Sequence, residues 1–133
     1  MRNDFVLWLA SWYPSLLDPL QGDFVQRHAQ AVSAYHPVEL WAFIEDPEGK
    51  ITSNHLLEVK HNGRLTEYIV YYNTASAPPL VPYKIWRLQR LLRLSNQLIT
   101  SHYEHKALPK LVHTHIIMNL GITEEVPFIY FQF

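Results

Sequence analysis

The chain has 133 residues, of which 48% are hydrophobic and 17% charged, with Lys+Arg 11 against Asp+Glu 12 and no cysteine. The lack of cysteine excludes a disulfide-stapled module, a thiolate metal site and a cysteine nucleophile. The balanced charge argues against a nucleic-acid partner, and the high hydrophobic content excludes a disordered tail. No apolar run approaches the ~20 residues of a membrane-spanning helix, and the first apolar stretch is too short for a secretory signal. We therefore expect one cytoplasmic domain spanning residues 1–133, whose aromatic content of 14% serves its core or a surface covered by a partner.

The first third of the chain has the pattern of a strand, a helix and a second strand. Residues 5–10 form a continuous apolar run, which is typical of a strand buried on both faces. A proline-containing loop follows, and apolar residues then recur at helical spacing over 24–35, with Asp23 as the expected N-cap. Residues 38–44 predict the next strand. Together they predict a right-handed βαβ unit.

The rest of the chain predicts a hairpin, a long helix and two more strands. The hairpin insertion covers about residues 51–76 and turns at Asn62-Gly63, a strong hairpin signal. A helix is expected from Tyr83 to about residue 105, a strand over 111–117 and a strand-like run over 126–133. These elements predict an α/β domain with a mostly parallel sheet and an inserted hairpin.

The loop after the first strand is one candidate binding region, because ligands of open α/β sheets bind beyond the carboxyl ends of the strands. Gly22 lies just before the expected helix, where a glycine would let a phosphate or sugar oxygen approach free backbone N–H groups. Asp23 would repel an anion at that place. The alternative is a loop glycine that needs positive φ, and the local sequence favours it.

A second candidate region is His113-Thr114-His115, near the end of the 111–117 strand. Residues i and i+2 of a strand share a face. The two histidines are interpreted as metal ligands, as buried histidines bonded to loops, or as a pair in which His115 contacts a substrate. The metal interpretation is the weakest of the three, since the sequence offers no cysteine and places Glu124 and Glu125 on a segment of uncertain structure.

A basic stripe marks the long helix. Its members are Lys84, Arg87, Arg90 and Arg93. Such a stripe is usually a solvated face, and the apolar side of the helix is best explained by packing on the sheet. Contact with anionic lipid headgroups, with Tyr83 and Trp86 at the interface, is the alternative. The common hydrolase, NTPase and dinucleotide-binding motifs do not occur.

Three stretches carry a resemblance to a known family. Residues 6–25 include Trp-Tyr-Pro and then Gly-Asp-Phe-Val, Tyr68–Tyr72 is a strand before a basic helix, and Leu111–His115 is followed by Gly121. In this order and spacing they resemble the N-terminal domain of bacterial, retaining glycosyltransferases of family 4 (group 1) with the GT-B fold. The resemblance covers almost the whole chain.

This resemblance implies a Rossmann-like three-layer α/β/α fold and transfer of a sugar from a nucleotide sugar to a glycan or lipid-linked acceptor. It implies that His115 is the catalytic residue, at the cleft between domains, and that Gly22 lies near the donor phosphates. The expected substrate-binding residues are Trp12, Tyr13, Gly22, Asp23 and His113. No metal and no cofactor are expected besides the nucleotide sugar, which is the donor substrate.

The chain departs from the family's pattern in its last part. Lys110 stands where the family usually has an acidic residue, and only residues 122–125 separate Gly121 from Val126. A parallel crossover needs at least about 10–12 residues, so the segment 122–133 must pair differently, stay loose or join another chain's sheet. We therefore expect a truncated domain, inactive without a donor-binding C-terminal domain.

Two other functions compete with this one. The chain is interpreted alternatively as a non-catalytic remnant that binds a glycan or self-associates, with a homodimer formed through the C-terminal strand. A third interpretation is an adaptor at the inner face of the membrane, acting through the basic stripe.

Overall fold

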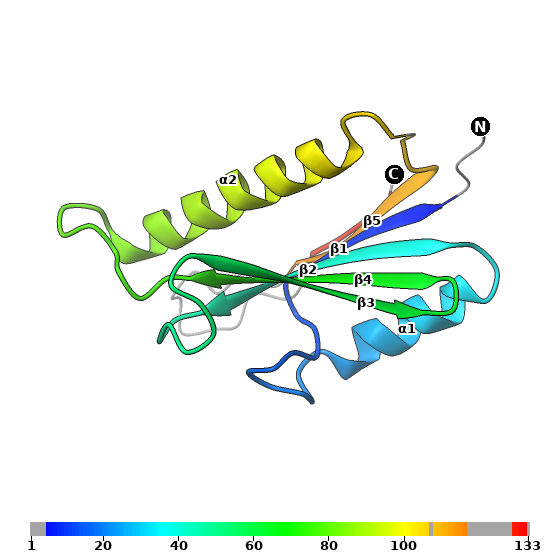
Figure 1. Ribbon diagram of the computed structural model, residues 1–133, viewed down its shortest axis with the longest axis horizontal. Helices are drawn as coiled ribbons and strands as arrows, with labels where there is room; N and C mark the ends of the chain where they lie inside the picture. Colours follow the sequence, from blue (N-terminus) through cyan, green and yellow to red (C-terminus); the bar gives the residue numbers. More distant parts are fainter. Residues whose placement is uncertain (1–4, 107, 117–128, 133) are drawn as a thin grey trace.

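The computed structural model of the chain describes residues 5–106, 108–116 and 129–132, with residues 115, 116 and 129–132 described by their backbone. They form one sheet of six strands in the order β3-β4-β2-β1-β5-β6, with two helices (Figure 1). In chain order the elements are β1 (Val6–Ala10), α1 (Asp23–Ser33), β2 (Val38–Asp46), β3 (His55–Asn62), β4 (Leu65–Asn73), α2 (Tyr83–Tyr103), β5 (Leu111–Ile116) and β6 (Ile129–Gln132). These positions agree with the elements expected from the sequence.

Strand β1 lies in the middle of the sheet, parallel to β2 on one side and to β5 on the other. Val6 pairs with Val38 of β2 and with Leu111 of β5. Because the strand is flanked on both edges and covered on both faces, its side chains are buried apart from a partly exposed Leu9. This explains the continuous apolar run in the sequence.

The hairpin of β3 and β4 extends one edge of the sheet. Strand β4 runs parallel to β2, with Val38 opposite Leu65, and β3 pairs antiparallel to β4. Gly63 has a φ of 60° at the turn, and Arg64, the second turn residue, is not at positive φ. Glycine at the first of two turn residues is the requirement of a type II′ turn.

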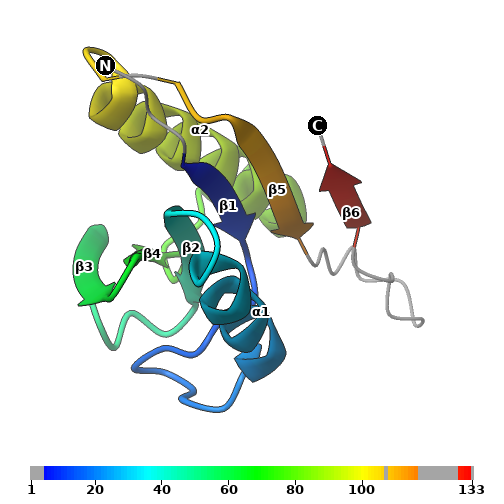
Figure 2. The same ribbon diagram turned by 90° about the vertical axis from the view of Figure 1, so that its right-hand side faces the viewer.

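One helix packs on each face of the sheet, as the end-on view shows (Figure 2). Val25 and Ala29 of α1 join a core with Trp8, while Leu94 and Tyr103 of α2 join a second core with Phe5. The alternation of side chains along the strands separates the two cores.

The prediction of a Rossmann-like three-layer α/β/α fold is wrong. The sheet is mixed, since β3 and β6 run antiparallel to their neighbours, and the described part has six strands but only one helix on each face. The physical reason lies in the connections. The chain passes from β2 to the parallel strand β4 by way of a strand, β3, where a Rossmann-like fold would place a helix.

Two local features also differ from or refine the expectations. The N-cap of α1 is Gly22, in the left-handed region, and Asp23 is the first helical residue, so the assignment of Asp23 as N-cap is wrong. The Asp23 side chain instead accepts a hydrogen bond of 2.6 Å from Nε of Arg27, one turn along the helix. At the other end of the chain, β6 pairs antiparallel with β5, one of the arrangements left open for the final segment.

Candidate functional site

The carboxyl end of β1 is the centre of the candidate site. There the chain leaves the sheet into the loop 11–22, which lies on the α1 face, while a cavity lies on the α2 face. The two sides use their polar groups in different ways.

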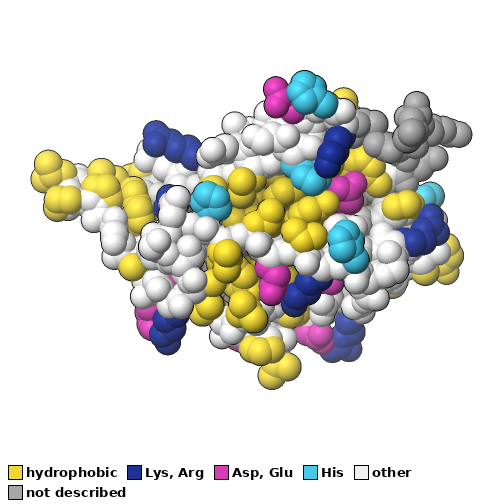
Figure 3. All heavy atoms as spheres, in the orientation of Figure 1, with side chains coloured by type: hydrophobic (Ala, Val, Ile, Leu, Met, Phe, Trp, Pro, Cys, Tyr) yellow, Lys and Arg dark blue, Asp and Glu magenta, His cyan; other side chains and the backbone are white. Residues whose placement is uncertain are grey.

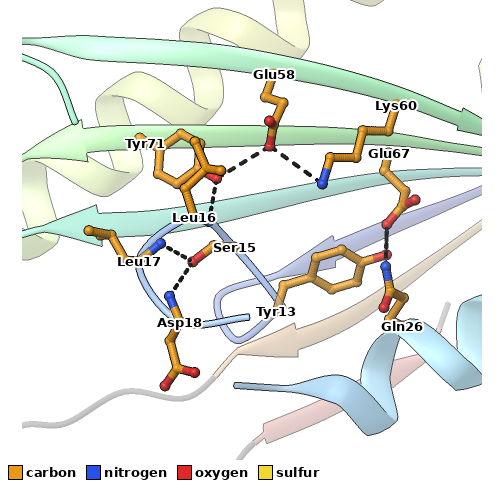
Figure 4. A network of polar contacts seen from close by, with 10 residues as sticks. All are labelled: Tyr13, Ser15, Leu16, Leu17, Asp18, Gln26, Glu58, Lys60, Glu67 and Tyr71. Carbon is orange, nitrogen blue, oxygen red and sulfur yellow. Dashed lines mark hydrogen bonds and ion pairs between the residues drawn. The ribbon is translucent and has the colours of Figure 1, made fainter. Parts of the chain in front are cut away.

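Tyr13 anchors the loop from within. Its side chain is fully buried, and its hydroxyl donates a short hydrogen bond to Glu67 of β4. Nε2 of Gln26 donates to the same carboxylate at 2.9 Å (Figure 4). Burial raises the pKa of Tyr13 well above its usual value, and the hydrogen bond to Glu67 raises this pKa further. The tyrosine is therefore a protonated donor that holds the loop to the sheet.

The next residues of the loop are held by a second set of contacts (Figure 4). The backbone N–H of Leu16 donates to the Tyr71 hydroxyl at 2.9 Å, and that hydroxyl donates to Glu58 at 3.3 Å. Oγ of Ser15 accepts from the backbone N–H groups of Leu17 and Asp18, each at 3.3 Å. The loop therefore has a defined path, which Ser15 of the loop and Tyr71 of β4 stabilise.

Gly22 closes the loop by close contact with its beginning. Its φ is 68°, and a Cβ on it would lie 2.5 Å from the carbonyl carbon and oxygen of Trp12 and 2.6 Å from the Tyr13 nitrogen. The positive φ expected at Gly22 is thereby confirmed, while its place near donor phosphates stays a prediction. The Trp12 ring packs edge-on against Phe24, with 5.1 Å between centroids. Trp12 and Tyr13 thus lie against Gly22 at the start of α1, of which Asp23 is the first residue.

The two histidines of β5 lie beside β1. His113 is buried, with its ring centroid 4.2 Å from that of Trp8, its partner in the strand register. The backbone of His115 pairs with Ala10 on one side and with Tyr130 on the other. The side chain of His115 and the whole of Gly121 lie outside the described residues. The catalytic role of His115 stays a prediction.

On the α2 face, a cavity of about 330 Å³ opens beside the end of β1. Its walls come from β1, β2 and α2 and are mostly apolar, with three hydroxyls and one amide among them. The lining residues are Leu9, Ala10, Ser11, Phe43, Leu91, Leu92, Ser95, Asn96, Ile99 and Thr100. The size and the mixture of many apolar with few polar groups are typical of a small-molecule site.

The amino-acid pattern carries only a faint signal for this cavity. Ser95 interrupts the apolar face of the long helix, and Asn96 and Thr100 follow close to it. Small polar side chains in place of leucine leave room between helix and sheet. No motif joins these residues to Ser11, which only the fold brings near.

The basic stripe of α2 divides into two kinds of residue. Arg87 holds Glu45 of β2 with two hydrogen bonds, that from Nη2 measuring 2.7 Å. Arg90 donates to the carbonyl oxygens of Asn73 and Asn54, both at 2.7 Å. Lys84 and Arg93 are exposed. The stripe therefore serves in part to fasten α2 to the ends of β2, β3 and β4.

A second hollow, of about 340 Å³, lies between α2 and the start of β3. It is more polar than the first, and no acidic residue is among its lining. The lining residues are Asn54, His55, Trp86, Gln89, Arg90, Arg93, Leu94 and Gln97. Arg90 and Arg93 of this lining belong to the basic stripe that the sequence singled out.

The comparisons with known proteins add no further assignment: no protein-family model matches the chain, and no curated protein sequence matches it. Within the described residues no cluster of three or more histidine, aspartate or glutamate side chains could hold a metal ion. Nor is any helix of the described part both long and apolar enough to cross a membrane.

Proposed function

We propose that this chain is the acceptor-binding part of a sugar-transfer enzyme and that the cavity on the α2 face receives the acceptor. The observation that carries the proposal is the position of this cavity beside the carboxyl end of β1, where ligands of such sheets bind. The resemblance of the chain to the N-terminal domains of glycosyltransferases supplies the reaction class.

The lining of the cavity supports an acceptor with an apolar part and a hydroxyl group. Leu9, Phe43 and Ile99 offer apolar walls, while Ser95 and Asn96 offer groups that hydrogen-bond an alcohol. A lipid-linked sugar or another alkylated glycoside has this composition. A free, highly charged ligand does not.

The reaction requires a second domain. The acceptor oxygen would bond to the anomeric carbon of the donor sugar while the bond from that carbon to the nucleoside diphosphate breaks. The acceptor's proton passes to a base, and the diphosphate leaves with the electron pair. We assign donor binding to a separate C-terminal domain, and we place His115 near the reacting atoms because its backbone pairs with Ala10, a residue of the cavity wall.

A lipid-linked acceptor also suggests where the protein works. The connector before α2 carries Leu80, which is 95% exposed, and hydrophobic side chains project at this end of the molecule (Figure 3). Tyr83 and Ile85 are exposed beside Lys84. Apolar and aromatic side chains with a neighbouring cation are suited to an anionic membrane surface. We therefore place the protein in the cytoplasm, at the inner face of the membrane.

The test measures binding of octyl glucoside by the full chain below its micelle-forming concentration. Ser95→Phe puts a ring into the cavity, and we expect it to weaken binding about tenfold or more by filling the site. Ser101→Phe is the matched control, because Ser101 lies on the same helix, is exposed and does not line the cavity. Absence of binding, or equal binding by both variants, would overturn the proposal.

A transfer assay separates catalysis from simple glycan binding. The chain is combined with a donor-binding domain and nucleoside diphosphate sugars, and His115→Ala is compared with the unchanged chain. We expect transfer that the substitution abolishes. Glycoside binding without any transfer would instead identify the non-catalytic, glycan-binding alternative.

A further inference from the structure

Strand β3 presents a long open edge. It is the outermost strand on its side of the sheet, and no described segment pairs with its outer edge (Figure 2). Three of its hydrophobic side chains are exposed: Leu56 at 44%, Leu57 at 43% and Val59 at 45%. Natural proteins usually protect such an edge with charged side chains, proline, a bulge or a cover, because it is a template for pairing with another chain. Of these devices β3 has the charged pair Glu58 and Lys60.

The backbone pattern shows which groups of this edge are available. The N–H of Asn73 donates to the carbonyl of Asn54 at 2.8 Å, so this pair is a hydrogen-bonded one. Hydrogen-bonded and non-hydrogen-bonded pairs alternate along an antiparallel ladder. The backbone groups of Leu57, Val59 and His61 therefore face away from β4, toward the open edge.

The charges on β3 select one register for pairing with an identical strand. Glu58 and Lys60 lie on the same face, with 3.7 Å between Nζ and Oε1 (Figure 4). An antiparallel pair of β3 strands centred on Val59 places each Glu58 opposite the partner copy's Lys60, twice by symmetry. A shift of two residues either way places Glu58 opposite Glu58 or Lys60 opposite Lys60. Opposite charges across strands stabilise a pair and like charges destabilise it.

We propose that two copies of this chain associate through β3, antiparallel and centred on Val59, to form one sheet that continues across both molecules. The hydrogen bonds join Val59 to Val59 and Leu57 to His61 of the other copy, using the outward-facing backbone groups. The contact is isologous, as expected for a two-fold dimer. It is independent of the sugar-transfer function.

The small area of the contact makes the proposed dimer weak. One strand from each copy buries less than the roughly 1,200 Å² of a standard stable interface, so the dimer is reversible and forms with rising concentration. Sedimentation velocity over a concentration series measures this directly, and circular dichroism checks that each variant is folded.

Charge reversal is the decisive test. We expect Glu58→Lys alone to be monomeric, because lysines of the two copies would face each other. We also expect Lys60→Glu alone to be monomeric, because glutamates of the two copies would face each other. An equal mixture of the two variants should restore the dimer. Positions 58 and 60 both carry lysine in the first variant and both carry glutamate in the second, so each lysine then faces a glutamate. Val59→Pro should also abolish dimerisation, because it removes an outward N–H that no internal partner uses.

The matched controls are Glu48→Lys and Lys50→Glu. These residues form another exposed ion pair, at 2.9 Å, in the turn before β3, and give the same changes of net charge. We expect both controls to dimerise like the unchanged chain. A chain that stays monomeric at every concentration, a dimer that survives Val59→Pro, or a mixture that does not reassociate would each overturn the proposal.

Discussion

The two sides of the sheet differ at the end of β1: a loop fills the α1 side, here called the closed side, and a cavity lies on the α2 side, the open side. On the α1 side, the loop 11–22 fills the space, and Tyr13, Glu67 and Gln26 tie it down with buried polar contacts. On the α2 side, small polar residues of the helix leave a cavity of about 330 Å³. The loop that looks most like a motif therefore serves first to hold the structure, while the space for a ligand is made by residues with no motif.

Substitution of Gly22 tests the closed side most severely. Gly22→Ala adds a Cβ 2.5 Å from the Trp12 carbonyl and places a non-glycine residue at a φ of 68°. We expect a loss of about 2–4 kcal/mol, from the left-handed backbone and the steric overlap together. Denaturant unfolding measures it.

Gly63→Ala is the control for that experiment, since its φ is also positive, at 60°, but no atom of the described residues other than its chain neighbours lies within 4 Å of the added Cβ. It should cost only the backbone part, about 1–2 kcal/mol. Equal losses in the two variants would mean that the loop does not pack closely on Gly22.

The Tyr13 hydroxyl is the next strongest contact on the closed side. Tyr13→Phe leaves the buried Glu67 with Gln26 as its remaining described side-chain donor, and we expect a loss of about 1–3 kcal/mol in the free energy of unfolding. Tyr35→Phe, at an exposed tyrosine, should change stability by less than about 0.5 kcal/mol. If the two variants are alike, the loop is not anchored through Tyr13.

The same contact predicts a pH dependence. The pKa of Tyr13 is raised in the folded state by burial and then by Glu67, so the folded chain keeps a proton that the unfolded chain loses above about pH 10. This contribution to stability is therefore fully present below about pH 10 and falls above it, by up to about 1.4 kcal/mol per pH unit for one tyrosine.

Burial likewise raises the pKa of Tyr72 and Tyr103, so these tyrosines add to the loss of stability at high pH. Unfolding measured between pH 8 and pH 11 (an approximate range set by the ordinary tyrosine pKa) should show a shallower decline for Tyr13→Phe. An identical decline in the free energy of unfolding of Tyr13→Phe and of the unchanged chain would contradict the raised pKa of Tyr13.

The sequence predicts the local features of this fold but not the contacts between distant residues. The apolar run of β1 and the Asn62-Gly63 signal locate a central strand and a hairpin, because burial and turn chemistry are local properties. The fold class is mispredicted, because a strand-rich mixed sheet with one helix on each face and a Rossmann-like fold share these local patterns. The partners of Tyr13 and Arg87, which are Glu67 and Glu45, are 54 and 42 positions away in the chain. No spacing rule joins residues so far apart.

Arg87 provides the test of the open side, with the smallest expected effect. Its double hydrogen bond to Glu45 fastens the first half of α2 over the sheet, and so helps to fix the helix that lines the cavity. Arg87→Met keeps much of the side chain's length but removes the pair. Both groups are partly exposed, at 32% and 20%, so we expect a loss of only about 1 kcal/mol.

Lys84→Met removes an exposed charge from the same helix and should cost less than about 0.5 kcal/mol. If Arg87→Met also weakens octyl glucoside binding, the ion pair helps to shape the cavity as well as to hold the helix. If Arg87→Met and Lys84→Met are indistinguishable in unfolding, Arg87 does not fasten the helix. In that case the apolar core with Leu94 and Tyr103, together with the hydrogen bonds of Arg90, holds the helix without help from Arg87.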